Sequence, residues 1–410
     1  MGRDRSIYGA TSGSPRVHDG RAPPGLDRTA QPSVTTSGAI MCTASMQDDW
    51  DLLQRFLPES WAAKAVELGA LVRRRKIDSA ETLLRVLLIH LADGKSLRST
   101  VAYAREAQLC AINDTALLHR LRVAEEWLRW MAYELAKALR CCPLPGSAQK
   151  RFRIRLVDGT SISEPGSAGT DWRIHYAFRL DTLRCDTFTI TNPHVAEDFQ
   201  RYPVAEEDLL IGDRGYCKRK GITHVLTHGG QVLVRFHSNN LPLFTRRGSS
   251  FAVLEHLRGL SEGQPGDWDG WFRDPYDDHL VKGRLCALRK SPQAIELAHK
   301  QLRRKASRSG KKLQPQTLEY AEYVTLFTTV NRHHFTGEEV LLLYRGRWQI
   351  ELVFKRLKGI IGIGHLPTQH PESCVAWLYG KMVVALLVER VYREAESISP
   401  WGYPLRAPAG

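Results

Sequence analysis

The most informative segment of the chain reads YRGRWQIELVFKRLK and runs from Tyr344 to Lys358. Four of its residues recur at helical intervals: Tyr344, Arg347 three positions on, Glu351 four further on and Lys358 seven after that. At ~100° per residue these positions fall within roughly a 60° arc of one helix. One carboxylate therefore shares a stripe with two cations and a phenol. That arrangement suits an acid that holds a metal ion while its neighbours bind a phosphate.

Two aspartates upstream share a sequence context that suits the same chemistry. Asp158 follows a run of alternating cationic and apolar residues over 151–157, and Asp213 follows the apolar run 208–212. Both runs predict strands, so each carboxylate is expected at the end of a strand, open to solvent and metal. Taken alone, an Asp-Gly pair after a strand more often forms a turn. The prediction of a site rests on the combination of both aspartates with Glu351.

Three acids from distant segments can bind two divalent ions. Their carboxylate oxygens suit Mg²⁺ or Mn²⁺ better than zinc. Two such ions ~3.5–4 Å apart activate a water or a 3′-hydroxyl and stabilise the leaving oxygen. Asp158, Asp213 and Glu351 therefore predict phosphoryl transfer on a nucleic-acid backbone.

The same three segments carry a family resemblance. They are Asp158-Gly159-Thr160, the run Gly212-Asp213-Arg214-Gly215-Tyr216, and the spacing Tyr-(2)-Arg-(3)-Glu-(6)-Lys from Tyr344. In this order they resemble the insertion-sequence transposases of the IS-four type, over about residues 50–395. The resemblance implies an RNase H-like catalytic fold in which Asp158, Asp213 and Glu351 form an Asp-Asp-Glu metal triad. It also implies a mostly β insertion between the second aspartate and the glutamate, where the irregular stretch 238–320 lies.

The resemblance also implies an activity and roles for further residues. Members of that family cut both strands at the ends of an element, some through a DNA hairpin, and join the freed 3′-ends to target DNA. Tyr344, Arg347 and Lys358 would then contact phosphates near the cleavage point. Where a hairpin forms, a tryptophan of the insertion holds the distorted strand, and Trp271, with Trp268 second, is the candidate for stacking on a base. A place in the apolar core is the alternative for either tryptophan.

The N-terminal part of the sequence predicts helices. Apolar residues recur at three- and four-residue intervals from Trp61 onward. The segments 96–106 and 114–128 predict a pair that resembles a helix-turn-helix. Its second helix carries Arg120 and Arg122, which suit contacts with DNA phosphates or base edges. An ordinary helical bundle with a solvated basic face explains the same pattern equally well, and the catalytic resemblance favours DNA binding.

The predicted fold is therefore α/β, with an all-α N-terminal region before an interrupted RNase H-like core. The first residues, rich in Gly, Pro, Ser, Thr and Arg, have a composition typical of disorder. The expected order is a disordered tail or over-extended start over 1–45, a helical DNA-binding region over 46–145, the first part of the core over 146–237, the β-rich insertion over 238–320, and the second part of the core with the last helix over 321–400.

Composition agrees with a nucleic-acid partner. The 410 residues carry a net charge of +14 and a pI near 9.5, which favours a polyanion. No apolar run reaches the ~18 to 20 residues needed to span a bilayer, and the nearest candidate, 382–388, ends at two charged residues. Eight cysteines are scattered without a CxxC pair. That pattern predicts neither a zinc module nor disulfides, and fits a cytoplasmic, nucleoid-associated protein.

Taken together, these features predict a Mg²⁺- or Mn²⁺-dependent DNA transposase. Its expected partners are terminal inverted repeats and target sites in double-stranded DNA, on which it would act as a homodimer. Two alternatives stay open. One is a nuclease of the same fold that performs no strand transfer, and the other is a catalytically silent DNA-binding regulator from a decayed element.

Overall fold

A computed structural model describes residues 50–140, 152–310 and 312–396. The chain divides into two compact units, Met1–Trp50 and Asp51–Gly410, and the second is described below. The expected tail over 1–45 lies outside the described residues. Among the described helices, none combines the length and the hydropathy needed to cross a bilayer.

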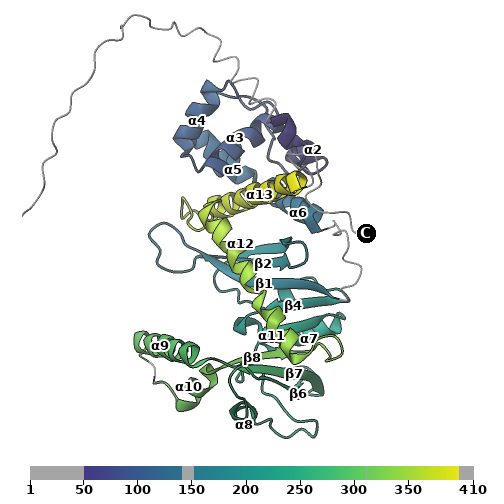
Figure 1. Ribbon diagram of the computed structural model, residues 1–410. Coiled ribbons are helices and arrows are strands. Elements are labelled where there is room, and N and C mark those ends of the chain that lie inside the picture. The colour runs from purple at the N-terminus through teal and green to yellow at the C-terminus, as the bar shows by residue number, and fades with distance from the viewer. Residues whose placement is uncertain (1–49, 141–151, 311, 397–410) are drawn as a thin grey trace, which may run out of the picture. The chain divides into compact units, whose positions relative to one another are not determined.

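One eight-stranded sheet forms the centre of the second unit (Figure 1). Its strands lie in the order β3-β2-β1-β4-β5-β8-β7-β6. β1, β4 and β5 are parallel to one another, and the remaining neighbours are antiparallel. The strands are β1 (Arg153–Ile162), β2 (Trp172–Arg179), β3 (Arg184–Thr191), β4 (Asp208–Gly212), β5 (Gln231–Arg235), β6 (Pro265–Arg273), β7 (Leu280–Arg289) and β8 (Tyr323–Thr328).

A buried apolar cluster covers one face of this sheet. Val157, Leu210 and Val232 contribute to it from three neighbouring strands. The helices α7 (Arg219–Thr227) and α8 (Val253–Arg258) add further apolar side chains. Side chains alternate across a strand, so the residues on either side of Val157 point to the opposite face.

The described residues before the sheet form helices and no strand. Three of these helices begin with a side-chain cap, which satisfies backbone N–H groups at the helix start. Ser79 accepts a hydrogen bond from Thr82 N (3.0 Å), and Ser96 and Asn113 cap their helices in the same way. The helices are α2 (Trp61–Glu67), α3 (Ala80–Asp93), α4 (Leu97–Glu106), α5 (Asp114–Val123) and α6 (Glu125–Arg140).

The last helix of the described chain packs against this helical region. α13 (Pro371–Glu396) contacts α3, α5 and α6. α6 also contacts β3, where the rings of Tyr133 and Phe188 stack with centroids 5.2 Å apart. The single helix expected over 114–128 is instead two, because α5 ends at Val123 and α6 begins at Glu125.

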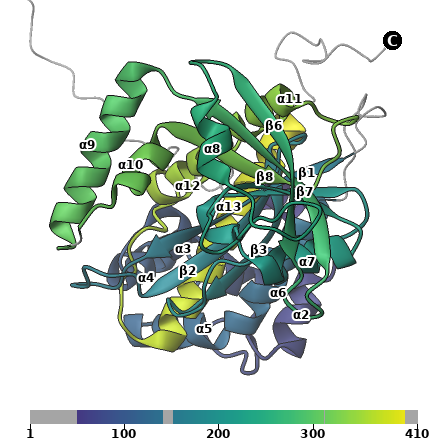
Figure 2. The ribbon, with the colours of Figure 1, turned by 90° about the horizontal axis from the view of Figure 1, so that it is seen from below.

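The segment 238–320 differs from the mostly β, separate insertion that was expected. Its two strands, β6 and β7, continue the central sheet, because β7 pairs with β8 from Arg284–Thr328 to Arg289–Tyr323. It also contains α9 (Pro292–Arg308) and α10 (Pro315–Ala321), which lie side by side (Figures 1 and 2). The capping residue Ser291 and a proline at the first helical position start α9. Basic residues from Arg303 to Arg308 therefore lie in a helix.

Candidate active site

Parallel pairing places Asp158 and Asp213 side by side. Leu156 of β1 lies beside Ile211 of β4. Asp158 follows Leu156 by two residues, and Asp213 follows Ile211 by two residues. The expectation that Asp158 ends its strand is wrong. β1 continues past it because pairing with β2 persists, whereas the pairing with β4 stops at Leu156. Asp213 does follow β4, and its Oδ1 accepts a hydrogen bond from Gly215 N (2.7 Å).

Asp158 points to the face of the sheet that α12 (Trp348–Gly359) covers. It lies directly opposite Tyr176 of β2, and residues opposite one another in an antiparallel pair share a face. The Tyr176 ring lies 6.1 Å from the ring of Phe354 on α12. The carboxylate of Asp158 is therefore directed toward the helix that carries Glu351.

Periodicity predicted one continuous helix from Tyr344 to Lys358, but the structure has two helices there. α11 (Gly337–Arg345) ends before Gly346, and α12 begins at Trp348. Between them Arg347 N bonds to Tyr344 O at 3.0 Å, an i to i−3 bond that tightens the turn. Gly346 and Arg347 keep right-handed helical backbone angles through this turn, and Arg347 contacts both Tyr344 and Glu351.

Arg347 connects two of the three predicted acids. Its Nη1 lies 3.4 Å from Asp158 Oδ2, and its Nη2 donates to Glu351 Oε1. The Asp158 side chain is 16% exposed and that of Glu351 is 52% exposed. The structure thus brings Asp158, Asp213 and Glu351 together, with a guanidinium in contact with two of them.

Asp158 is the acid whose environment is most unusual. Burial raises its pKa to about 7, against a hydrogen bond from Gly159 N (2.8 Å) that favours the ionised form. The charge of Asp213 raises the pKa further, and that of Arg347 lowers it. A carboxyl in this state holds a proton loosely at neutral pH, and a divalent cation would displace that proton.

A cavity of about 780 Å³ opens beside Asp213. Its walls come from the end of β5, from α9 and α10, and from Tyr344 in α11. Burial raises the pKa of Tyr344 to about 12, so its phenol stays a hydrogen-bond donor at neutral pH. Asp213 is the acid among the described lining residues. The cations that line the cavity are Arg214, Arg235, Lys290, Lys305 and Arg347.

Three of these cations stand close together without an acidic partner. Within the described chain, Arg214, Arg235 and Lys290 form no ion pair. Burial lowers the pKa of Lys290, and the charges of Arg235 and Arg214 lower it further. Like charges gathered in this way favour an anionic ligand such as a phosphate.

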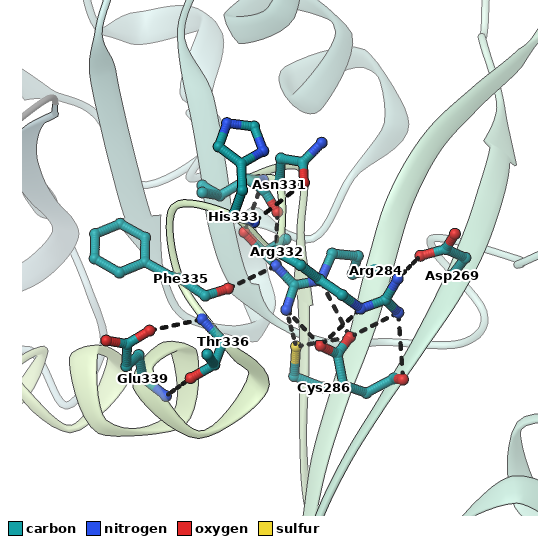
Figure 3. Close-up of polar contacts among 12 residues, drawn as sticks. Asp269, Arg284, Cys286, Asn331, Arg332, His333, Phe335, Thr336 and Glu339 are labelled. Carbon is teal, nitrogen blue, oxygen red and sulfur yellow. Dashed lines mark hydrogen bonds and ion pairs between the residues drawn. The ribbon is translucent and has the colours of Figure 1, made fainter.

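The hairpin of β6 and β7 holds the loop that leads into α11 (Figure 3). Arg284 Nη2 donates to Asp267 Oδ2 at 2.6 Å, and Arg284 Nη1 donates to the carbonyls of Val330 and Phe335, each at 2.9 Å. Arg332 of the loop also binds Asp267, with 3.1 Å between Nε and Oδ2. The segment inserted between the second aspartate and the glutamate therefore positions α11 and, through it, the residues of the site.

Other residues predicted for the site lie apart from this cavity. Lys358 is exposed on α12 and does not line it. Trp271 lies on the edge strand β6, with the ammonium of Lys282 5.9 Å from its ring centroid. Trp268 packs against the buried apolar cluster, where its ring lies 5.5 Å from that of His256. Base stacking by either tryptophan stays a prediction.

The two arginines predicted to contact DNA from the N-terminal helices both bind other parts of the chain. Arg120 Nη2 donates to Arg73 O at 2.8 Å. Arg122 Nε donates to Ser373 Oγ at 2.7 Å and thereby links α5 to α13. DNA contact by Arg120 or Arg122 also stays a prediction.

The structure places one further acid, Glu197, beside the aspartates. Glu197 belongs to an acidic stretch over 197–208 that is typical of a solvated loop. Instead its side chain is half-buried next to Gly159 and Gly215. Burial raises the pKa of Glu197, and the charge of Asp213 raises it further. The glycines after both aspartates were the one local signal that a side chain must fit there.

A separate group with metal-ligand spacing lies at the turn between β6 and β7. Its members are Asp274, Asp277 and His279. Asp277 and His279 are exposed and pair with one another, while Asp274 Oδ2 accepts a hydrogen bond from Thr223 Oγ1 at 2.9 Å. Each side chain of this group already has a protein partner.

Within the described residues the acids of the central site lie farther apart than that group does, but their donors suit a divalent cation. The donors are carboxylate oxygens, which Mg²⁺ and Mn²⁺ prefer. Asp213 pairs with no cation in the described chain, and its charge repels that of Asp158. A cation between the two strands would relieve this repulsion, and Arg347 could then release the acids it now binds.

Comparisons with known proteins identify the family. The family model described as a transposase DDE domain matches residues 150–387. The transposase of insertion sequence element IS421 from Escherichia coli is 32% identical over 360 residues, which cover 86% of this chain and 96% of that protein. The transposase of element IS231F from Bacillus thuringiensis subsp. israelensis is 25% identical over 201 residues, which cover 44% of this chain and 40% of that protein.

The chain belongs to the DDE transposases of insertion sequences. The matched residues, 150–387, include Asp158, Asp213 and Glu351. The similarity to the IS421 protein extends beyond that domain, so the transposase shares with it much of the region outside 150–387 as well.

Proposed function

We propose that this transposase cuts DNA at the ends of its insertion sequence by divalent-metal-dependent phosphoryl transfer and joins the 3′-ends to target DNA. The observation that carries the proposal is the convergence of Asp158, Asp213 and Glu351 around Arg347. These acids would hold two Mg²⁺ or Mn²⁺ ions. Bound there, the ions would activate the attacking hydroxyl and stabilise the leaving oxygen.

The sheet supports the RNase H-like core that the family resemblance implies. Three antiparallel strands, β1 to β3, are followed by β4 and β5, which run parallel to β1. This arrangement carries Asp158 on the first strand and Asp213 after the fourth. The strands β8, β7 and β6 extend the same sheet, and we assign them and α8 to α10 to the insertion and its return.

Arg347 would change partners during the reaction. In the protein alone it neutralises Asp158 and Glu351. Once cations take over that role, the guanidinium can turn toward the cavity that it also lines and donate two N–H groups to the phosphate being cut. The Tyr344 hydroxyl would donate a hydrogen bond to the same phosphate, and Lys358 would contact a neighbouring one.

The cationic cavity beside Asp213 would receive the DNA strand next to the cut. Its unpaired cations can bind successive phosphates, and Tyr320 supplies an aromatic side chain to its wall. If the reaction passes through a hairpin, Trp271, or Trp268 in second place, would stack on the distorted strand. Their location outside the cavity makes substitution by Ala the necessary test: loss of hairpin formation with cleavage retained would support that role.

The ends of the element would be recognised by the N-terminal helices. The α4–α5 pair and the basic side chains of α5, among them Arg120 and Arg122, are the proposed contact region. Cleavage at two ends requires two active sites, so we propose that a homodimer assembles on double-stranded DNA. Cross-linking with and without duplexes that carry the terminal repeats would test this assembly.

The experiment that tests the function uses purified protein, Mg²⁺ and DNA carrying the flanking terminal repeats. Wild-type protein should cleave at the repeat ends and then join the 3′-ends to a target plasmid. Glu351→Gln and Asp213→Asn should bind the same DNA and cleave nothing. Glu206→Gln, which removes an exposed acid outside the site, is the matched control and should retain full activity.

The outcomes separate the function from its alternatives. Cleavage without joining would indicate a nuclease of the same fold. End binding without cleavage by the wild-type protein would indicate a regulator from a decayed element. Cleavage by Glu351→Gln at the wild-type rate would overturn the proposed metal site.

A further inference from the structure

Glu197 has a backbone held in place on both sides. It lies in the loop between β3 and β4, immediately before a short 3-10 turn that begins at Phe199. Lys218 Nζ donates to Glu197 O at 2.6 Å, and Arg201 Nε donates to Ala196 O at 2.7 Å. Asp198 caps the turn by accepting from Gln200 N at 3.0 Å. These contacts fix the direction in which the Glu197 side chain leaves the loop.

Both glycines that follow the catalytic aspartates make room for this side chain. A β-carbon at Gly159 would lie 2.6 Å from Glu197 Oε1, and one at Gly215 would lie 2.9 Å from Glu197 Oε2. At either distance the Glu197 carboxylate would have to shift. Gly215 also adjoins Asp213, whose Oδ1 would lie 3.0 Å from the added atom. The glycines that follow both aspartates thus border the same carboxylate, that of Glu197.

The carboxylate of Glu197 has no protein donor. Within the described residues, neither of its oxygens accepts a hydrogen bond or forms an ion pair, although the side chain is half-buried. Arg173 and Lys218 attract it only from a distance, and Asp213 repels it. Loss of solvation without a partner is unfavourable for an acid. A cation at the site would supply the missing partner.

We propose that Glu197 is a fourth carboxylate of the metal centre, directed at the ion that Asp158 and Asp213 share. The proposal rests on the function proposed above and extends it to a residue outside the three family motifs. Two divalent ions bring four positive charges, one more than the three motif acids neutralise. Glu197 supplies the fourth negative charge, and its fixed loop allows it to hold the ion from the side opposite the exposed Glu351.

Metal binding by the protein with its DNA, rather than activity alone, tests this role. The Kd of Mn²⁺ would be measured by electron paramagnetic resonance on the complex with a terminal-repeat duplex. Glu197→Gln keeps the shape of the side chain and should weaken Mn²⁺ binding by about tenfold or more. Asp213→Asn should do the same. Glu206→Gln, an exposed acid that follows in the same loop, should bind Mn²⁺ as the wild type does.

A second measurement tests the contact between Glu197 and Gly159 and the folding of the variant. Gly159→Ala should lower Tm in the wild-type background, because the new methyl group meets Glu197 Oε1. In a Glu197→Ala background the same change should cost little. Thermal unfolding in EDTA should also show that Glu197→Gln is folded, so that weaker binding is not a consequence of unfolding.

The results distinguish this proposal from the function on which it rests. If Asp213→Asn loses Mn²⁺ while Glu197→Gln binds it with unchanged Kd, Glu197 is no ligand and the proposed function stands. If the wild-type complex takes up no Mn²⁺, or Asp213→Asn binds it as tightly as the wild type does, the metal site itself is wrong and both proposals fail. Equal losses in Glu197→Gln and Asp213→Asn, with Glu206→Gln unaffected, support both.

Discussion

Two aspartates in this molecule, Asp158 and Asp267, are buried to a similar degree beside arginines. Their pKa values nevertheless shift in opposite directions. The Asp267 side chain is 20% exposed and that of Asp158 is 16% exposed. Burial alone would raise the pKa of Asp267, but hydrogen bonds from Arg284 and Arg332 outweigh it and lower that pKa. Burial raises the pKa of Asp158 to about 7, because its one arginine lies 3.4 Å away and Asp213 repels it.

The difference lies in the number of partners rather than in burial. Asp267 receives hydrogen bonds from two guanidinium groups, so its charge is fully compensated and the β6–β7 hairpin is locked to the loop before α11. Asp158 has one long contact with Arg347 and a carboxylate neighbour. A compensated acid stabilises the fold, whereas an under-compensated acid keeps affinity for a cation from solution.

The largest expected difference between Asp158 and Asp267 is in catalysis after each acid is replaced. Asp158→Asn should reduce strand cleavage by on the order of 10³-fold or more, because a metal ligand is lost. Asp267→Asn should leave cleavage nearly intact at a temperature where the protein stays folded. Single-turnover cleavage of a terminal-repeat duplex measures both. A similar loss of cleavage in the two variants would show that the pKa contrast has no functional meaning.

Replacing the arginine that binds Asp267 should destabilise the fold more than replacing the arginine that binds Asp158. Arg284→Met removes hydrogen bonds to Asp267 and to two carbonyls from a side chain that is 4% exposed, so it should lower the free energy of unfolding by about 3 kcal/mol. Arg347→Met should change stability by less than about 1 kcal/mol, since it removes one long contact with Asp158 and an ion pair with Glu351, whose side chain is 52% exposed. Urea unfolding in EDTA measures both values. A larger loss in Arg347→Met would contradict the distinction.

Much of the site was predictable from local patterns in the sequence. The alternation before Asp158 and the apolar run before Asp213 predicted strands, and β1 and β4 are found there. Parallel strands that each carry an acid after the same register position then bring the acids together. The spacing of Tyr344, Arg347, Glu351 and Lys358 also predicted a helix, and α11 and α12 lie in that region.

Other features depend on contacts that no local pattern reports. The tightened turn at Gly346 interrupts a helical periodicity that continues on both sides of it. The pairing of β7 with β8, which makes the insertion part of the central sheet, joins segments far apart in the chain. Glu197 resembles its solvated neighbours in sequence, and only the space left by Gly159 and Gly215 distinguishes it.

Stability as a function of pH sharpens the contrast between the two aspartates. In the unfolded chain an aspartate titrates near ~4. The folded pKa of Asp158 is higher, about 7, so folding favours its protonated form; stability is lost as pH rises through that range. Without divalent ions, Asp158→Asn should therefore raise the free energy of unfolding at pH 8 by roughly 1–3 kcal/mol, at about 1.4 kcal/mol per pKa unit. The gain should vanish near pH 4.

Asp267 should behave in the opposite way in the same titration. Its folded pKa is lowered, so its stabilising contribution is present above the unfolded pKa and is lost on acidification. Asp267→Asn should therefore destabilise the protein at pH 8 and have less effect at acidic pH. Chemical unfolding of both variants in EDTA at pH 4, 6 and 8 measures these trends. Parallel pH profiles for the two variants would contradict the opposite shifts.

The smallest effect extends the comparison from acids to arginines. Arg235 lines the cavity beside Asp213 and forms no ion pair in the described chain, whereas Arg258 is bound through two hydrogen bonds to Glu319 at the surface. Arg235→Gln should weaken DNA binding about three- to tenfold and reduce the salt slope by about 1, because one phosphate contact is lost. Arg258→Gln removes the same charge from a compensated pair and should leave the slope unchanged. Fluorescence anisotropy across a salt series measures both slopes. A change of equal size in the two variants would mean that net charge governs DNA binding, rather than the unpaired cations of the cavity.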